Sequence, residues 1–257
     1  MNTFVELYAA SIGAIALAFV RLAPVMLLPV LSPMARVPFS IRVVLTLVVA
    51  VAASQLYGAS PATQGADFST LVRLAPAQLL LGLALAFGYQ ATMSAIMTIG
   101  RALDLQMGFG AAGVLDPATQ NSESLIGTMM MWLVFVLTIE TGLHYELLGA
   151  LLFSFQVYPL DAMLPAYDPQ ILLFLLAEQF SLALLLALPV IIALFLFDAA
   201  LGLTAKTMPQ MNVYFVMLPL KMFVSILALS MTMVTVGVGI EQMFGVLREY
   251  WLGLLAR

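Results

Sequence analysis

The sequence predicts an all-α membrane protein with about six long apolar helices arranged as hairpins. Apolar residues make up 63% of its 257 residues and charged residues only 9%, whereas soluble proteins carry about 25% charged residues. The apolar runs are long and unbroken, unlike the short alternating segments of a membrane β-barrel. The chain has no cysteine and a net charge of −4. No cluster of basic residues indicates a nucleic-acid partner.

The first half of the chain predicts three helices. The N-terminal apolar run follows Glu6 and has no basic leader, so it is typical of a retained first span and not of a cleaved signal peptide. Arg21 and Pro24 interrupt this run, and we expect the helix to end or kink there. A second helix is expected over 38–57 and, after a polar loop, a third over 71–99.

The second half predicts three more helices. The apolar run at 124–155 would outrun a bilayer as one straight helix, so we expect a break near Thr141 and Gly142. After a proline-rich loop, a fifth helix is expected over 171–205 and a sixth over 213–246.

The C-terminal tail, residues 241–257, combines charges and aromatic residues with leucines. This composition is typical of a helix at the membrane interface. We therefore expect it to form an interface helix of its own.

Residues 101–121, RALDLQMGFGAAGVLDPATQN, differ from the apolar runs on either side. Gly108, Gly110 and Gly113 lie close together and Asp116-Pro117 follows, which predicts a non-helical segment. Such backbone needs cover from protein or water inside a membrane. The letters GFGAAG match a dinucleotide-binding pattern, but no strand precedes them, so that function is rejected. Our hypothesis is that the segment lines or plugs a path.

Charged side chains inside apolar runs mark either function or pairing. The candidates are Arg21, Glu140, Glu178, Asp198 and Lys221. Asp198 and Lys221 flank one connector, which predicts a salt bridge between the last two helices. Glu140 and His144 are four residues apart and are expected to share a helical face. A structural contact is favoured there over a proton relay or metal site, because the chain has a single histidine.

Several blocks together resemble the FliR family of flagellar biosynthetic proteins, whose injectisome relatives are the SctT proteins. Arg21 is followed by Pro29, Pro38 and Arg42. The blocks GRALDLQMGFGAAGVLDPATQ at 100–120, GLHYELLGALLFSFQVYP at 142–159 and GLTAKTMPQMNVYFVMLPLK at 202–221 come next. The resemblance covers about residues 15–225, and L-Q-M-G favours the flagellar branch. One departure is Arg101, where members often carry Glu; Asp104 is the candidate substitute.

The resemblance implies a subunit of the type III export gate that assembles with FliP and FliQ and lies close to FlhB and FlhA. It implies a location in the bacterial inner membrane, at the flagellar basal body. Its substrates would be exported flagellar proteins. It also implies a P-like part over 1–170 and a Q-like hairpin with a C-terminal helix over 171–257. The plug loop it implies comprises Gln106, Met107, Gly108, Phe109, Gly110, Gly113, Asp116 and Pro117. The hairpin connector with Pro209, Gln210, Asn212 and nearby Lys221 would face FlhB.

Two other functions are alternatives to a structural channel subunit. A proton-coupled transporter of a small solute could use Glu140, His144 and Asp198, but the chain lacks a paired-carboxylate site and clear inverted repeats. A membrane enzyme is disfavoured because no nucleophile–base pair or metal cluster is evident, and no cofactor is expected.

Overall fold

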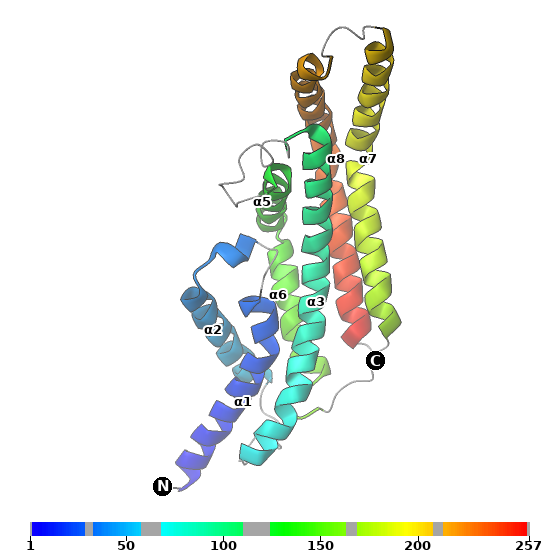
Figure 1. The fold of residues 1–257 in the computed structure, drawn as a ribbon. Helices are drawn as coiled ribbons and strands as arrows, with labels where there is room; N and C mark the ends of the chain where they lie inside the picture. The colour runs from blue at the N-terminus through cyan, green and yellow to red at the C-terminus, as the bar shows by residue number, and fades with distance from the viewer. Residues whose placement is uncertain are drawn as a thin grey trace. The chain divides into compact units, whose positions relative to one another are not determined.

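The described part of the chain is helical throughout its regular elements (Figure 1). The computed structural model describes residues 2–28, 33–57, 68–109, 124–162, 169–207 and 213–255. Its helices are α1 (Asn2–Leu27), the 3-10 helix η1 (Pro33–Arg36), α2 (Phe39–Tyr57), α3 (Phe68–Met107), α5 (Leu125–Glu140), α6 (Leu143–Val157), α7 (Pro169–Thr207) and α8 (Val213–Leu255). The predicted all-α class is confirmed.

Two predicted helix ends are wrong. Helix α1 does not end at Pro24 but continues to Leu27, although Pro24 cannot donate a backbone hydrogen bond; the kink expected as the alternative stays a prediction. Helix α3 extends past residue 99 to Met107, so the first seven residues of the stretch 101–121 are helical. Leu103 and Met107 on this extension are 3% and 0% exposed. Burial of these side chains stabilises the added turns.

The predicted break after the fourth apolar run is confirmed. Helices α5 and α6 are bent by 78° at Thr141-Gly142. Gly142 has a φ of +77°, a left-handed conformation that glycine adopts without the steric cost of a Cβ atom.

The interface helix predicted for the C-terminal tail is not a separate helix, and its location at a membrane interface stays a prediction. Residues 241–255 continue α8 without a break. Tyr250 and Trp251 are buried, and they donate hydrogen bonds to the α3 carbonyl oxygens of Ala84 (2.9 Å) and Leu85 (3.1 Å). The tail therefore packs into the protein because its two aromatic donors find partners there.

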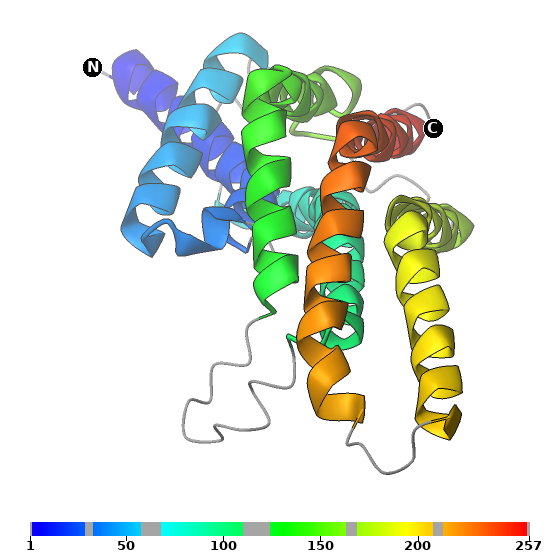
Figure 2. The same cartoon turned by 90° about the horizontal axis from the view of Figure 1, so that it is seen from above.

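The chain forms two compact units, and each combines distant segments. Unit 1 comprises 1–91, 138–175 and 246–257. In it, α2 packs against α1 and α6 (Figure 2). These units differ from the P-like part, residues 1–170, and the Q-like part, residues 171–257, that the family resemblance implies. That division refers to likeness to other subunits and stays a prediction.

Unit 2 comprises 92–137 and 176–245. It contains two helix pairs. The C-terminal part of α3 and helix α5 form the α3–α5 pair, and the antiparallel helices α7 and α8 form the α7–α8 pair (Figure 1). Leu103, Met107 and Ile126 from the first pair form one apolar cluster with Ala187, Val190 and Leu194 of α7.

Four of the described helices are long and apolar enough to cross a membrane, namely α2, α3, α7 and α8, and the bent α5–α6 pair raises the number to five. Helix α3 has 40 residues, α7 has 39 and α8 has 43. At about 1.5 Å per residue a helix of this length reaches roughly 60 Å, twice the hydrocarbon core of a bilayer at about 30 Å.

Candidate functional site

The glycine-rich segment begins where α3 ends. Gly108 follows the last helical residue with a φ of +89°, and its backbone N–H lies 3.3 Å from the carbonyl oxygen of Leu105. A left-handed glycine directly after a helix is a common way to end it. A side chain at this position would meet no neighbour, so the requirement for glycine comes from backbone conformation.

At the other end of that segment, α5 begins with its free N–H groups satisfied by two side chains. The Ser124 hydroxyl accepts from the N–H of Gly127 at 2.9 Å, as a Ser N-cap does. The Asp104 carboxylate accepts from Leu125 through Oδ2 at 2.8 Å and from Ile126 through Oδ1 at 3.3 Å. We call this set of contacts the α3–α5 clamp.

The clamp works electrostatically as well as through its hydrogen bonds. Asp104 lies in the last turn of α3, where the helix dipole disfavours a carboxylate, but it faces the positive end of the α5 dipole. Asp104 is 7% exposed and Ser124 is 6% exposed, so water competes little for these contacts. The two ends of the segment are thereby held together.

Below the clamp, α3 and α5 touch backbone to backbone. A Cβ atom added to Gly100 would lie 2.5 Å from the Cα atom of Gly127. Such proximity requires a glycine, as in the small-residue contacts of membrane helices.

The bulky residues of the predicted plug have different environments. Met107 is fully buried in the apolar cluster of unit 2, and Phe109 packs partly buried against the same cluster. Gln106 is exposed on the last turn of α3. Their role as a plug stays a prediction.

Arg21 occupies a buried polar centre in unit 1. It is 1% exposed. Its guanidinium donates to Gln78 Oε1 (2.7 Å) and to the carbonyl oxygens of Ser154 (2.9 Å) and Tyr158 (2.7 Å), and it lies 4.2 Å from the ring centre of Phe155. The two carbonyl groups lie at the C-terminus of α6, where a cation interacts favourably with the helix dipole. Arg21 therefore joins α1, α3 and the end of α6.

The expected salt bridge between the last two helices is confirmed. Lys221 Nζ lies 2.7 Å from Asp198 Oδ1 and 2.9 Å from Asp198 Oδ2. The Asp198 side chain is half exposed, so the pair is one between partly solvated groups.

The shared face expected for Glu140 and His144 is wrong. Glu140 ends α5 and His144 lies in α6, beyond the 78° bend. His144 Nδ1 instead lies 3.1 Å from the carbonyl oxygen of Thr138, and its ring contacts that of Tyr145. Glu140 is exposed and Glu178 is half-buried. Among the described residues, no group of three acidic, histidine or cysteine side chains could hold a metal ion.

Seven predicted site residues lie outside the described residues: Gly110, Gly113, Asp116, Pro117, Pro209, Gln210 and Asn212. The plug and connector roles assigned to them stay predictions.

The sequence reasoning missed Gln78, Ser124 and Ser154 as partners of the candidate residues. Ser124 carried a usable signal, because a serine directly before an apolar run is a common N-cap. Gln78 and Ser154 carried none, since they lie 57 and 133 residues from Arg21 along the chain.

The family model of bacterial export proteins, family 1, matches residues 12–247. The chain belongs to this family. The flagellar biosynthetic protein FliR of Bacillus subtilis (strain 168) is 33% identical over 187 residues, which are 71% of this chain and 72% of that protein. The FliR protein of Caulobacter vibrioides is 27% identical over 238 residues, 90% and 93% of the two chains.

This bacterial export protein also resembles secretion proteins outside the flagellum. The Yop proteins translocation protein T of Yersinia pestis is 29% identical over 167 residues, 63% of this chain and 64% of that protein. The resemblance to the FliR family and its SctT relatives is confirmed. The blocks that carried it, at 100–120, 142–159 and 202–221, all lie inside the matched residues.

Proposed function

We propose that the chain is a structural, pore-forming subunit of the flagellar type III export gate, without catalytic activity of its own. It assembles with FliP and FliQ and passes unfolded flagellar proteins across the inner membrane. The family match over residues 12–247 carries this proposal, together with relatives named as flagellar biosynthetic and protein translocation proteins. FlhB and FlhA are the neighbouring partners.

Helix length supports an assembled gate over an isolated span. Helices of about 60 Å extend beyond a bilayer core of about 30 Å, and protein subunits are the natural cover for their excess apolar length. Phe195, Phe223 and Val234 on α7 and α8 are 70%, 64% and 85% exposed. Residues 1–170 form the P-like part of the gate subunit and 171–257 its Q-like part.

The α3–α5 clamp supports a plug at residues 106–117. Asp104 and Ser124 hold the start of α5 beside the end of α3, so the segment between them is tethered at both ends. A loop tethered in this way can fill an opening without being carried off by a passing chain. The connector with Pro209, Gln210 and Asn212 faces FlhB on the cytoplasmic side.

The plug is tested by conductance. We expect Phe109→Ala, and more strongly a deletion of residues 108–113, to raise ion conductance through membranes that contain the chain with FliP and FliQ. Phe153→Ala is the matched control, because Phe153 is an exposed phenylalanine of α6 far along the chain. Conductance equal to that of the control would show that the segment is only a connection. Failure of the chain to co-purify with FliP and FliQ would reject the gate itself.

No observation favours a proton-coupled transporter. Glu140 and His144 lie on separate helices, and Asp198 is neutralised by Lys221.

A further inference from the structure

Charged residues divide the two long helices of the α7–α8 pair at matching positions. On α7, Asp198 follows Glu178 by 20 residues, and on α8, Glu241 follows Lys221 by 20 residues. No charged residue lies between Glu178 and Asp198 or between Lys221 and Glu241. These four residues bound one uncharged segment on each helix, and we call the two segments together the uncharged band.

Contacts between the two helices show that the segments lie at the same level. At one end of the band, the salt bridge of Asp198 with Lys221 joins the helices. At the other end, Gln179, the neighbour of Glu178, donates through Nε2 to the carbonyl oxygen of Met243 at 2.8 Å, two residues beyond Glu241. The charged residues therefore form two rows, one at each end of the band.

The distance between the two rows matches the thickness of a membrane. At about 1.5 Å per residue, 20 residues of α-helix span roughly 30 Å, and the hydrocarbon core of a bilayer is also about 30 Å thick. Both helices are apolar over nearly twice this length. Their length and composition alone therefore do not determine which half lies in the membrane, whereas the rows do.

The outer surface of the band carries large apolar side chains. Leu185 and Phe195 of α7, and Phe223 and Met231 of α8, are each exposed over more than half of their surface. An exposed apolar surface of this kind marks a contact with a membrane or with another protein. A protein partner could cover an apolar face of any height, but a bilayer requires the height that the two rows define.

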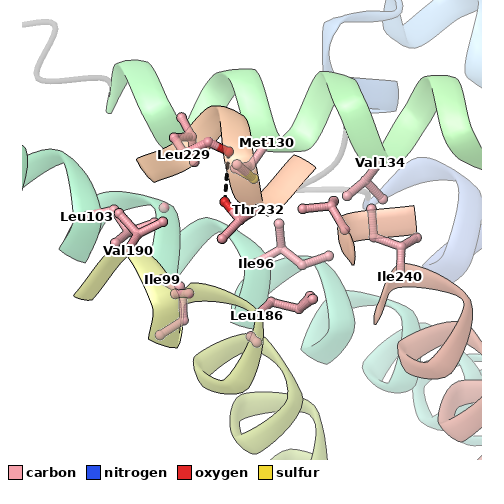
Figure 3. A pocket seen from close by; sticks show the side chains of 14 residues that line it. Ile96, Ile99, Leu103, Met130, Val134, Leu186, Val190, Leu229, Thr232 and Ile240 are labelled. Atoms are coloured by element: carbon pink, nitrogen blue, oxygen red, sulfur yellow. Dashed lines mark hydrogen bonds between the residues drawn. The ribbon is translucent and has the colours of Figure 1, made fainter. Parts of the chain in front are cut away.

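The hydroxyl groups of the band on α8 need no water. Ser225, Ser230 and Thr232 each donate to a carbonyl oxygen of α8 itself, at 2.6, 2.8 and 2.7 Å. The bond from Thr232 is the dashed line in Figure 3. Thr235 makes a bond of the same kind at 2.9 Å. Such bonds satisfy the hydroxyl donors within the helix, as surroundings without water require.

We propose that the outer face of the uncharged band contacts the hydrocarbon of a lipid bilayer, and that the two charged rows lie at its two headgroup levels. There the charged side chains reach headgroups or water, as long charged side chains at the ends of spans do, whereas a charge inside the hydrocarbon is costly. Helix α7 continues beyond Asp198 to Thr207, so the tip of the hairpin projects out of the hydrocarbon. The proposal holds whether or not the chain forms a gate.

The depth of single residues in a bilayer tests this placement. The chain has no cysteine, so one introduced cysteine at a time carries a nitroxide spin label. The full chain is reconstituted into liposomes of phosphatidylethanolamine and phosphatidylglycerol. Electron paramagnetic resonance then measures collisions of the label with oxygen, which concentrates in hydrocarbon, and with a polar nickel chelate, which stays in water.

The ratio of oxygen to nickel collisions should be highest in the middle of the band. Leu188 and Met231 each lie ten residues from both rows and are exposed, so Leu188→Cys and Met231→Cys should give the highest ratios. Val238→Cys, close to the Glu241 row, should give an intermediate ratio. Lys206→Cys and Gln242→Cys, at exposed positions outside the band, are the controls and should give low ratios.

Three results would overturn the proposal. Few collisions with either reagent at Leu188 and Met231 would mean that a partner subunit or a second copy covers the band. Frequent nickel collisions there would mean that water covers it. A ratio that is higher at Leu173, outside the band, than at Leu188 would reject the two rows as headgroup levels. Val234→Cys, also exposed on the band, replaces Met231→Cys if that variant does not accumulate.

Discussion

The two units of this chain share an apolar composition but hold their helices together by different means. In unit 1, Arg21 and Gln78 donate to backbone carbonyl groups of Ser154, Tyr158 and Leu160, so one polar centre joins three helices. Tyr250 and Trp251 add α8 to α3 in the same way. Hydrogen bonds have preferred distances and angles, so this packing specifies one arrangement.

In unit 2, each polar contact named above stays within one helix pair. Asp104 joins α3 to α5, while Lys221 joins α8 to α7. The two pairs meet through apolar side chains, where Leu103 and Met107 pack against α7. We call this contact the apolar seam. Apolar contact has no directional preference. The comparison predicts that unit 1 constrains its helices more tightly than the two helix pairs of unit 2 constrain each other.

The largest expected effect is at the polar centre of unit 1. Arg21→Ala would remove the buried donor of Gln78 Oε1 and of the Tyr158 carbonyl oxygen, while the Ser154 carbonyl oxygen would keep its bond from the Tyr158 N–H (3.0 Å). We expect the free energy of unfolding to fall by about 3–5 kcal/mol, since each unsatisfied buried group costs roughly 1–3 kcal/mol. Thermal unfolding of the purified chain in detergent, followed by circular dichroism, measures this.

Arg73→Ala is the control, because Arg73 is an exposed arginine of α3 in the same unit. It should change the free energy of unfolding by no more than about 0.5 kcal/mol. Equal effects of the two substitutions would mean that the polar centre does not hold unit 1 together.

Local sequence signals predicted much of this fold. The all-α class, the break at Thr141-Gly142 and the fifth helix, expected over 171–205 and found as Pro169–Thr207, all follow from apolar run length and glycine or proline positions. The pairing of Asp198 with Lys221 was predictable because both residues flank one connector.

Long-range contacts account for what the sequence could not predict. Helix α3 reaches Met107 because that side chain enters a cluster with residues of α5 and α7, and no local pattern encodes such a cluster. One signal was overlooked. Asp104 stands in the last turn of a helix, where a carboxylate is unfavourable, and this conflict indicated a partner elsewhere, namely the start of α5.

A smaller effect is expected at the helix crossing inside the α3–α5 pair. In Gly100→Ala the new Cβ atom would lie 2.5 Å from Gly127 Cα and 2.9 Å from Gly127 N. The backbones must separate, and we expect a loss of about 1–3 kcal/mol in the free energy of unfolding, as for other overpacked contacts. Gly202→Ala is the matched control, since its added Cβ would have no neighbour within 4 Å beyond the adjacent backbone of its own helix. That control should be neutral or stabilising by up to about 1 kcal/mol.

The smallest effect is expected at the α3–α5 clamp, and it gives the most direct test of the contrast between unit 1 and unit 2. Asp104→Asn keeps one acceptor oxygen but loses the charge at the α5 N-terminus, so we expect a loss of about 1–2 kcal/mol. Hydrogen exchange of single amides should accelerate at Leu125 and Ile126. Ser124→Ala, at about 1 kcal/mol, should instead accelerate exchange at Gly127, whose N–H loses its acceptor.

The helices in which Asp104→Asn accelerates hydrogen exchange show whether the two helix pairs of unit 2 open separately or together. If the apolar seam transmits no directional constraint, faster exchange stays within α3 and α5, and α7 amides such as that of Val190 keep their rates. Faster exchange in α7 as well would mean that the two pairs open together, and the contrast with unit 1 would then fail. Faster exchange confined to α3 and α5 is the expected result, because the Asp104 carboxylate accepts its hydrogen bonds from Leu125 and Ile126 at the start of α5. It would show that the ends of the glycine-rich segment can loosen while the α7–α8 pair stays intact.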